Sequence, residues 1–425
     1  MRKIININFN GIIFPVFLFL CIILTLSAKA EDIHVGYNKK YSRLKDALSI
    51  VKDGDRILVE HGLYKEGNLI IDKSVELIGN SFPVLDGNFT DEIITVKASN
   101  VRIKGFLIRN SGKAYMKDVA GIRVENSNNV ILEHNIMEDN FFSIYLANSS
   151  GSKILSNKIS GKSSSESFSG NGIHLWNCNN ILIEGNETYG QRDGIYLEFV
   201  KDSKIVYNLS RNNLRYGLHF MFSEGNSYVR NTFRNNGAGV AVMYTYHVEM
   251  IDNIFEDNWG NNSYGLLLKD IGKSLIKGNT FSKNTVGIYV EASSQLVIKE
   301  NKFVSNGWAM KILGNCIEDT IVCNNFLNNT FDISTNTSRT INYFDNNYWD
   351  KYAGYDLDKN NIGDVPYRPV SLFSVVVEKT PEAMLLLRSF LVDLLDLSER
   401  VVPVFISENL IDNNPQMKLI EHDSN

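Results

Sequence analysis

Between residues 194 and 290 the sequence reads Gly194-Ile195-Tyr196-Leu197, Gly217-Leu218-His219-Phe220, Gly239-Val240-Ala241-Val242, Gly265-Leu266-Leu267-Leu268 and Gly287-Ile288-Tyr289-Val290. Each Gly-apolar-x-apolar unit precedes a polar turn, a second apolar-x-apolar segment and an asparagine. Alternation with a period of two residues indicates short strands that turn one face inward. Because three or four residues cannot bury that face alone, the coils must stack. The sequence therefore predicts an all-β parallel β-helix solenoid with coils of about 22 residues.

The recurring asparagine suits a bend, because Asn tolerates left-handed dihedrals and bonds to neighbouring backbone. The spacings are 22, 23, 22, 26, 22 and 23 residues, over Asn186, Asn208, Asn231, Asn253, Asn279, Asn301 and Asn324. Stacked from coil to coil, these side chains are predicted to form an amide ladder along the axis. Departures from the period indicate extruded loops, at residues 161–167 and, smaller, at residues 259–262.

Residues 1–30 are predicted to be a cleaved signal peptide, with an uncleaved anchor as the alternative. Two basic residues precede an apolar run over residues 11–26, and Ala28-Lys29-Ala30 is a small-x-small cleavage site. The β-helix is expected over residues 31–350. Within it, residues 42–52 predict a short amphipathic helix that covers the open end of the first coil.

The C-terminal extension, residues 351–425, loses the repeat. Oxygen-bearing side chains at alternate positions match the spacing of a calcium loop, at Asp356, Asp358, Asn360 and Asp364. Tyr367 stands where such a loop carries its bidentate Glu. A hydrogen-bonded Asx-rich turn that closes the solenoid is the alternative.

An apolar amphipathic helix is predicted over residues 380–402. Thr380 suits the N-cap, and Pro381 the first helical position. Charged residues near the middle of this helix argue against a transmembrane span. The helix either caps the last coil or docks on a partner at the membrane, and we favour docking. The predicted docking residues are Leu386, Leu387, Phe390, Leu391, Leu394 and Leu395.

Side chains at equivalent positions of coils in register stack into columns. On the middle coils these columns predict an exposed patch of aromatic, histidine and methionine residues, formed by His174, Trp176, His219, Met221, Met243, Tyr244 and His247. Imidazole and thioether groups together could hold Cu(I), a soft ion, and aromatic columns could stack sugar rings. A protein interface, or stacking that only stabilises the sheet, is the alternative.

No catalytic residues are predicted. A glycosidase needs two carboxylates across a groove, and Asp193, Glu198 and Asp202 are candidates only through their closeness in sequence. From residue 31 onward the chain has 40 Lys and Arg against 48 Asp and Glu, a net charge of −8, which argues against nucleic acid as a general partner. The three cysteines beyond residue 30 show no disulfide framework.

Beyond about residue 171 the chain resembles the NosD family, the periplasmic maturation proteins of nitrous oxide reductase. The resemblance is carried by Gly170-Asn171-Gly172-Ile173-His174-Leu175-Trp176, Arg215-Tyr216-Gly217-Leu218-His219-Phe220-Met221-Phe222, Gly237-Ala238-Gly239-Val240-Ala241-Val242-Met243-Tyr244, Ser263-Tyr264-Gly265-Leu266-Leu267-Leu268-Lys269-Asp270, Asn347-Tyr348-Trp349-Asp350, Gly354-Tyr355-Asp356-Leu357-Asp358, Ile362-Gly363-Asp364-Val365-Pro366-Tyr367-Arg368-Pro369 and the apolar helix. Before residue 160 the likeness is to β-helices in general.

The resemblance implies a right-handed parallel β-helix outside the cytoplasmic membrane. It implies a non-enzymatic scaffold that works with an ABC-type transporter, made of a permease and an ATPase, and with a copper chaperone. Together these proteins assemble the copper–sulfide centre of apo nitrous oxide reductase. Transient Cu(I) at the patch is one expectation, and the C-terminal helix would meet the permease. The alternative is a carbohydrate-active β-helix enzyme, a lyase or an epimerase.

Overall fold

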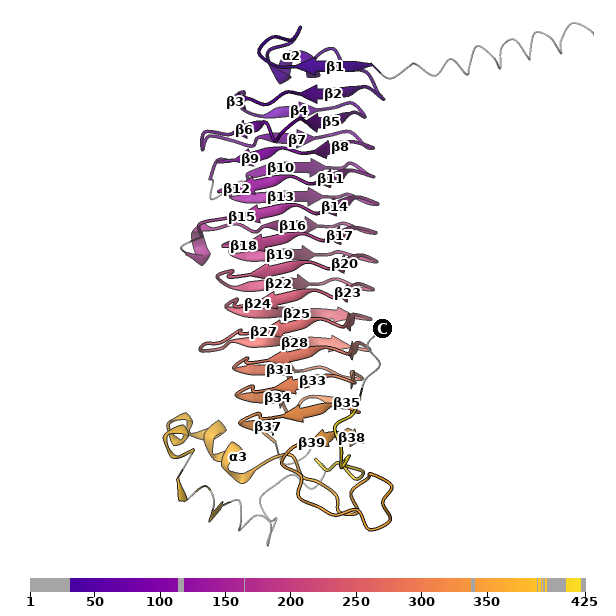
Figure 1. Cartoon of the computed structure of the whole chain (residues 1–425), viewed down its shortest axis with the longest axis vertical. Helices are drawn as coiled ribbons and strands as arrows, with labels where there is room; N and C mark the ends of the chain where they lie inside the picture. Colours follow the sequence, from indigo (N-terminus) through magenta and orange to yellow (C-terminus); the bar gives the residue numbers. More distant parts are fainter. Residues whose placement is uncertain are drawn as a thin grey trace, which may run out of the picture.

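The computed structural model describes residues 31–421 except 114–117, 164, 338–340, 388, 391, 393 and 396–409. The chain winds into a long solenoid of three sheets, stacked coil upon coil along the vertical axis of Figure 1. The strands of each sheet pair in parallel with the equivalent strands of the neighbouring coils, mostly 22 or 23 residues away. The predicted β-helix is therefore confirmed. The predicted signal peptide lies outside the described residues.

The first sheet has 14 strands. They are β1 Asp32–Val35, β2 Arg56–Val59, β5 Glu76–Gly79, β8 Arg102–Lys104, β11 Ile131–Glu133, β14 Lys153–Leu155, β17 Leu182–Glu184, β20 Lys204–Val206, β23 Ser227–Val229, β26 Glu249–Ile251, β29 Leu275–Lys277, β32 Val297–Lys299, β35 Ile317–Val322 and β38 Ile341–Asp345.

The second sheet has 12 strands and contains the Gly-apolar-x-apolar units. They are β4 Leu69–Ile71, β7 Ile94–Val96, β10 Ala120–Glu125, β13 Phe142–Ala147, β16 Ile173–Trp176, β19 Asp193–Glu198, β22 Tyr216–Met221, β25 Ala238–Tyr246, β28 Tyr264–Gly272, β31 Val286–Glu291, β34 Trp308–Ile312 and β37 Phe331–Ser334.

The third sheet has 13 short strands. They are β3 Leu63–Tyr64, β6 Val84–Asp86, β9 Leu107–Arg109, β12 Ile136–Glu138, β15 Lys158–Ser160, β18 Glu187–Tyr189, β21 Leu209–Arg211, β24 Thr232–Arg234, β27 Ile254–Glu256, β30 Thr280–Ser282, β33 Lys302–Val304, β36 Asn325–Leu327 and β39 Tyr348–Trp349.

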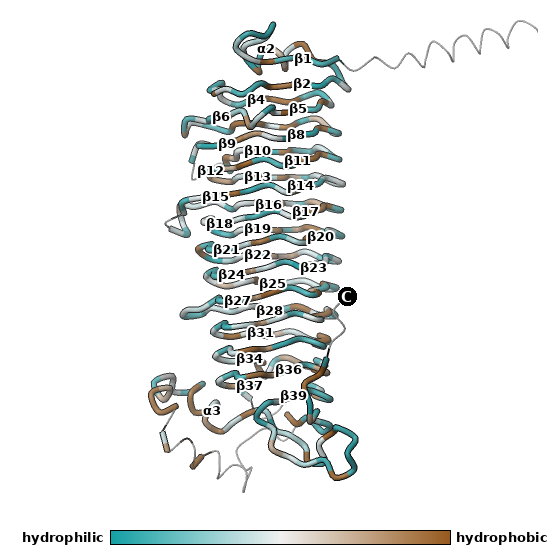
Figure 2. The backbone as a smooth tube through the Cα atoms, in the orientation of Figure 1, coloured by the Kyte–Doolittle hydropathy of each residue, from teal (hydrophilic) through white to brown (hydrophobic). Residues whose placement is uncertain are grey.

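Stacked side chains fill the axis of the solenoid. Apolar and polar residues alternate along the coils (Figure 2), and the apolar residues that form the core are buried. A row of buried rings continues through five coils, with centroids 4.0–5.0 Å apart, from Phe255 through Phe281, Phe303 and Phe326 to Trp349. Met250 is also buried, as its inward position predicts.

The predicted amide ladder is confirmed. In each rung the Nδ2 of one asparagine donates to the Oδ1 of the next, as from Asn208 to Asn231 at 2.9 Å and from Asn253 to Asn279 at 3.0 Å. A second ladder, which the sequence analysis missed, runs from Asn213 through Asn236, Asn258, Asn284 and Asn306 to Asn329. Its members lie five residues after those of the first ladder, so the repeat itself contains the signal.

Both ends of the core are closed. At the N-terminal end, helix α2 (Leu44–Leu48) buries Leu44 and Ala47 over the first coil. This helix is shorter than predicted, and the Glu66 carboxylate accepts hydrogen bonds from its first backbone N–H groups at 2.7 and 2.9 Å. At the C-terminal end, residues 362–370 and 410–416 return to pair with the last strands.

The C-terminal helices differ from the prediction. Helix α3 (Leu372–Lys379) precedes the predicted start, and Ser371 caps it by accepting from the Ser374 N–H at 3.1 Å. Thr380 ends α3 and is the N-cap residue of the next helix, with Pro381 at its first position as predicted, but the Thr380 side chain makes no cap hydrogen bond. The 3-10 helix η2 (Pro381–Leu386) follows, and the described residues Phe390, Val392, Leu394 and Leu395 are helical. Within the described part of the chain, none of the helices has the length and apolar character of a membrane span.

Candidate functional site

A column of aromatic and histidine rings lies on the outer face of the second sheet. His174 sits between Tyr145 and Tyr196, with ring centroids at 4.7 and 4.6 Å, and Tyr196 meets His219 edge-on at 4.9 Å. The Asn171 side-chain amide lies 3.0 Å from Nδ1 of His174. Burial lowers the pKa of His174 to about 3, so its imidazole is neutral at physiological pH.

His219 belongs to a buried ionic network. Its Nδ1 lies 3.2 Å from Nη2 of Arg215 and 3.8 Å from Oδ2 of Asp193. Burial raises the pKa of Asp193, but hydrogen bonds and charges from His219 and Arg215 outweigh it and hold this pKa below its ordinary value. His219 is only 6% exposed, so the prediction of an exposed imidazole at this position was wrong. The larger rings of Tyr196 and Tyr216 pack against it, at 4.9 and 4.8 Å.

Met221 and Met243 lie side by side in the next column. The two residues are register partners on β22 and β25, and both are partly exposed. The hydroxyl of Tyr196 donates to Sδ of Met221 at 3.8 Å and to Glu198 at 3.3 Å. The two thioethers therefore share one surface with Trp176, which is also exposed.

A stack of exposed aromatic rings comes from Phe199 and Phe222, which directly follow β19 and β22, and from Tyr244 near the end of β25. Phe199 stacks on Phe222 at 5.5 Å, and Phe222 on Tyr244 at 5.0 Å. Tyr246 and His247 lie beyond them, and Nδ1 of His247 is 3.4 Å from Glu224. The sequence analysis included Tyr244 and His247 but missed Phe199 and Phe222, although their spacing of 23 residues was the available signal.

The patch residues fit a resident copper ion poorly. A soft Cu(I) site would combine thioether and imidazole ligands, but the imidazole of His219 faces Arg215 and Asp193 below the surface. Nowhere in the described ranges do three His, Cys, Asp or Glu side chains converge as metal ligands. The structure thus brings together two thioethers and several aromatic rings, an arrangement suited to contact with a partner.

The Asp-rich loop is a hydrogen-bonded turn. Asp356 accepts from the backbone N–H of Asn360 and Asn361, at 3.1 and 2.9 Å, and Asp364 accepts from that of Leu357 at 2.7 Å. Asp358 accepts from the side chain of Asn360 at 2.9 Å. These oxygens thus have partners of the chain's own, as in the Asx-rich alternative, and calcium binding here stays a prediction.

The described residues between Ser371 and Leu395 form an arm that packs on the last coils. Val370 bridges Ile333, and Leu410 is fully buried. Phe373 and Val377 of α3 pack against Phe331 of β37, together with Val392 and the partly buried Leu387 and Leu395. The sequence analysis favoured docking of the C-terminal helix on a partner over capping of the last coil. In the structure, part of the arm packs on the last coils of the solenoid.

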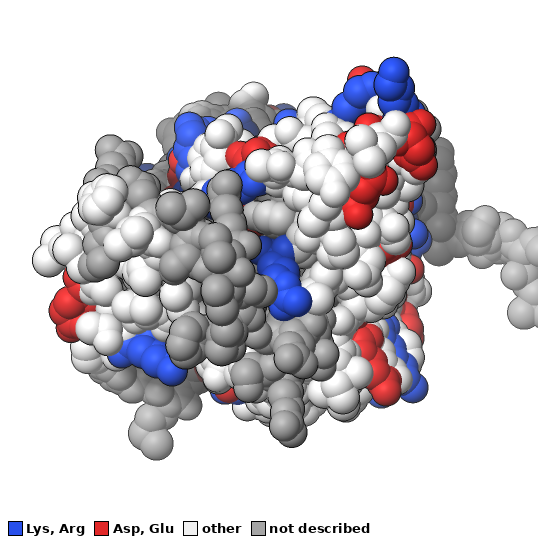
Figure 3. Space-filling model, turned by 90° about the horizontal axis from the view of Figure 1, so that it is seen from below, with Lys and Arg blue, Asp and Glu red and all other residues white. Residues whose placement is uncertain are grey.

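The other side of the arm is exposed. Phe390 is 78% exposed, and Leu386 and Leu394 are exposed as well. Leu386 ends the 3-10 helix η2, and Phe390 and Leu394 are helical residues that follow it, so the exposed apolar surface of the arm spans both segments. Seen from this end, much of the described surface is uncharged, and the charged side chains form separate groups, of which one basic group lies near the middle (Figure 3). Of the predicted docking residues, Leu387 and Leu395 face the solenoid, and Leu391 lies outside the described residues.

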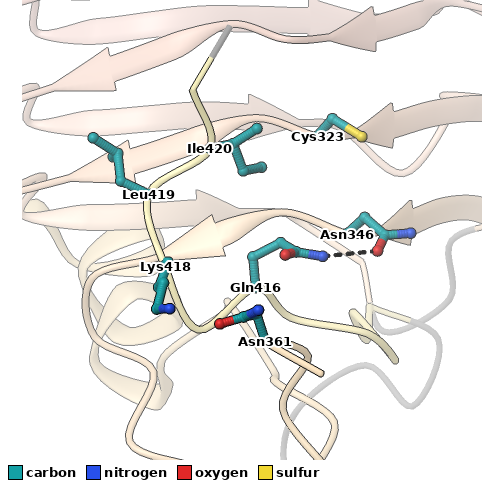
Figure 4. A pocket seen from close by; sticks show the side chains of 7 residues that line it. All are labelled: Cys323, Asn346, Asn361, Gln416, Lys418, Leu419 and Ile420. Atoms are coloured by element: carbon teal, nitrogen blue, oxygen red, sulfur yellow. Dashed lines mark hydrogen bonds between the residues drawn. The ribbon is translucent and has the colours of Figure 1, made fainter. Parts of the chain in front are cut away.

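A pocket of about 400 Å³ lies between the C-terminal strap and the last coils (Figure 4). It is lined by Cys323, Asn346 and Asn361 of the last coils and the loop that follows them, and by Gln416, Lys418, Leu419 and Ile420 of the C-terminal segment. Nε2 of Gln416 donates to Oδ1 of Asn346 at 2.9 Å. Burial raises the pKa of the Cys323 thiol, which disfavours a reactive thiolate.

These observations define a class of protein, a parallel β-solenoid with apolar contact surfaces on one corner and on a C-terminal arm. Residues 155–354 match the family model described as "Periplasmic copper-binding protein (NosD)". The chain is 28% identical to the probable ABC transporter binding protein NosD of Pseudomonas aeruginosa, over 88% of this chain and 91% of that protein. Its counterpart in Stutzerimonas stutzeri is 24% identical, over 83% and 85%. The chain belongs to the NosD family.

Comparison with a solved structure supports the fold. Tailspike protein 3 of bacteriophage CBA120 superposes with a TM-score of 0.53 at 12% identity. The match covers 76% of this chain and 62% of that protein. At this identity the likeness extends to the solenoid alone.

Proposed function

We propose that this protein is a periplasmic, non-enzymatic scaffold that connects an ABC transporter to client proteins during assembly of the copper–sulfide centre of nitrous oxide reductase. The transporter would comprise a permease and an ATPase, and the clients would be the apo reductase and a copper chaperone. Copper and sulfide are cargo in this proposal, and Cu(I) meets the chain only transiently.

The observation that carries the proposal is the anchored arm. Its exposed face of Leu386, Phe390 and Leu394 is unusual for a polar protein, and exposed apolar faces of this kind commonly bind partners. The bridge from Val370 to Ile333 and the packing of α3 on Phe331 hold this surface at one end of a long solenoid, which suits a protein that spans the distance between a membrane and a client. The names of the relatives support a transporter as the partner.

Co-purification tests the proposal. The full chain, tagged and extracted from membranes in mild detergent, is expected to bring the permease and the ATPase with it. The triple variant L386S/F390S/L394S should lose both partners, because serine removes the apolar face. The matched control is L357S, which changes an equally exposed leucine in the Asp-rich loop. Loss of the transporter from both variants, or from neither, would contradict the assignment of the arm.

A carbohydrate-active enzyme remains the second candidate. Its support is the buried network of Asp193, Arg215 and His219 beside Tyr196, since acids and aromatic rings recur in sugar-processing sites. The carboxylate of Asp193 is fully buried and paired with Arg215, which suits a structural ion pair better than a general acid. Turnover of an acidic polysaccharide that D193N abolishes would favour the enzyme.

A further inference from the structure

We infer that the aromatic corner, formed by Phe199, Phe222 and Tyr244 with Met221 and Met243, docks a protein segment that presents apolar side chains flanked by Lys or Arg. The inference deepens the proposed function and rests on it for the existence of a client protein. It assigns the client to a surface separate from the arm.

Bulky side chains at positions with a left-handed backbone make this stack exceptional within its column. Phe199, Phe222 and Tyr244 have φ values of 55°, 49° and 55°, in the left-handed region. The coils before them hold Asn148 and Asn177 at the same position, joined by a side-chain hydrogen bond. Asn tolerates this region at little cost, whereas bulky side chains are disfavoured there. The fold needs only an asparagine at these turns, so the aromatic residues call for another explanation.

Stacking alone does not supply that explanation. The rings are nearly parallel, at 15° and 12°, and such contacts contribute about 0.5–1.5 kcal/mol each. The rings nevertheless remain 44%, 43% and 42% exposed, whereas the inner row from Phe255 to Phe326 is at most 1% exposed. The inner row stabilises the core, and the outer stack leaves its ring edges in solvent.

The apolar surface continues beyond the stack. Trp176 and Tyr246 are exposed beside it, and Met221 and Met243 are partly exposed. Together these side chains cover four successive coils along one corner of the solenoid. A contiguous exposed apolar patch with aromatic and methionine residues is typical of a protein interface.

The surroundings of the corner indicate the charge of the partner. Six successive coils form this corner, with residues 176–180, 198–203, 221–226, 243–248, 269–274 and 291–295. These segments contain five carboxylates and three lysines, a net charge of −2. The carboxylates belong to Glu198, Asp202, Glu224, Asp270 and Glu291, and the lysines are Lys201, Lys269 and Lys273. Lys269 is paired with Glu291 at 3.2 Å, which leaves an excess of acid around the stack. Complementary charge therefore favours a basic partner segment.

Ring geometry favours a protein over a sugar. A sugar stacks on the face of an aromatic ring, but these rings cover one another's faces and present their edges. Leucine, methionine and aromatic side chains pack well against ring edges. Oligosaccharide binding at this corner is the opposing outcome.

The test uses the triple variant F199N/F222N/Y244N. Asparagine is the residue that this column carries in the two coils directly before the stack. The variant is therefore expected to fold and to melt within a few degrees of the wild type. Binding of purified apo reductase to the transporter-associated complex is measured by titration, and the dissociation constant should rise about tenfold or more. The matched control is Y207N, which changes a more exposed tyrosine with a left-handed backbone on another corner and should bind normally.

A second variant tests the charge. E198Q/E224Q should weaken binding several-fold at low salt and reduce its salt dependence, because both carboxylates flank the stack. Unchanged reductase binding by the folded triple variant would overturn the inference while transporter co-purification stands. A complex that lacks the transporter altogether would instead contradict the proposed function. Binding of a neutral oligosaccharide that the triple variant abolishes, without reductase binding, would also overturn the inference.

Discussion

At the residue scale, buried titratable groups link stability to pH, and Asp319 is the clearest case. Burial raises the pKa of Asp319 to about 7, although its Oδ1 accepts from the backbone N–H of Leu296 at 3.0 Å. The unfolded value is about 3.9, so this carboxyl costs stability increasingly as pH rises from about 4 to about 7. The cost is at most about 1.4 kcal/mol per pH unit in that window.

Asp319→Asn is therefore expected to stabilise the protein, more at pH 8 than at pH 5. Asn226 occupies the same column and makes the equivalent bond to the N–H of Ser203 at 2.9 Å, so the amide fits. Urea unfolding at the two pH values measures the effect. The neighbouring exposed Glu318→Gln serves as the control and should show no comparable pH dependence. An equal gain at both pH values would contradict the role assigned to the Asp319 carboxyl.

His174 links stability to pH in the opposite direction. Its folded pKa of about 3 lies below the unfolded value of about 6.5. Its contribution is therefore complete above pH 6.5 and is lost as pH falls toward 3, by at most about 1.4 kcal/mol per unit. His174→Phe keeps a ring between Tyr145 and Tyr196 and should reduce the loss of stability between pH 6.5 and pH 5. NMR of the wild type should show no imidazole titration in that range.

At the element scale, α3 decides how firmly the arm is held. Ser371 Oγ accepts from the Ser374 N–H, and Phe373 and Val377 pack against Phe331. Ser371→Ala should destabilise the helix by about 1 kcal/mol. Hydrogen exchange of the α3 amides should accelerate about fivefold, and amides of the central coils should be unaffected. Faster exchange throughout the solenoid would show that the arm is not an independent element.

At the scale of the whole molecule, the first amide ladder continues from Asn324 to Asn347, and Asp412 supplies the acceptor that this last asparagine needs. Oδ2 of Asp412 accepts from N and Nδ2 of Asn347 and from Nε1 of Trp349, each at 3.0 Å. Burial raises the pKa of Asp412, and these hydrogen bonds oppose the rise. A distant part of the chain thus terminates a ladder that runs through the solenoid.

Asp412→Ala should leave three buried donors without an acceptor and cost about 3 kcal/mol. Because solenoid coils contact mainly their neighbours, the loss should be confined to the last coils. Hydrogen exchange should show weaker protection of β38 and β39, with β10 to β19 unchanged. Asp412→Asn keeps the acceptor oxygen and is expected to lose much less. A uniform loss of protection would contradict nearest-neighbour stability.

The solenoid, its coil length, the amide ladder and the outward columns were predictable from the sequence, because each depends on a repeat that every coil contains. The sequence also indicated the family, through Met-Phe, Met-Tyr and Pro-Tyr-Arg-Pro segments that ordinary coils lack. Free cysteines at Cys178, Cys316 and Cys323 agree with the absence of a predicted disulfide framework.

Which of the outward residues are exposed could not be predicted from the repeat. His219 points outward in the pattern, yet Tyr196, Tyr216 and the Asp193–Arg215 pair bury it, because side chains of adjacent coils lie about 5 Å apart and large ones cover small ones. The sequence also did not predict that α3 starts at Leu372 or that Asp412 closes the ladder. Both depend on contacts between segments at least 40 residues apart, which no local pattern encodes.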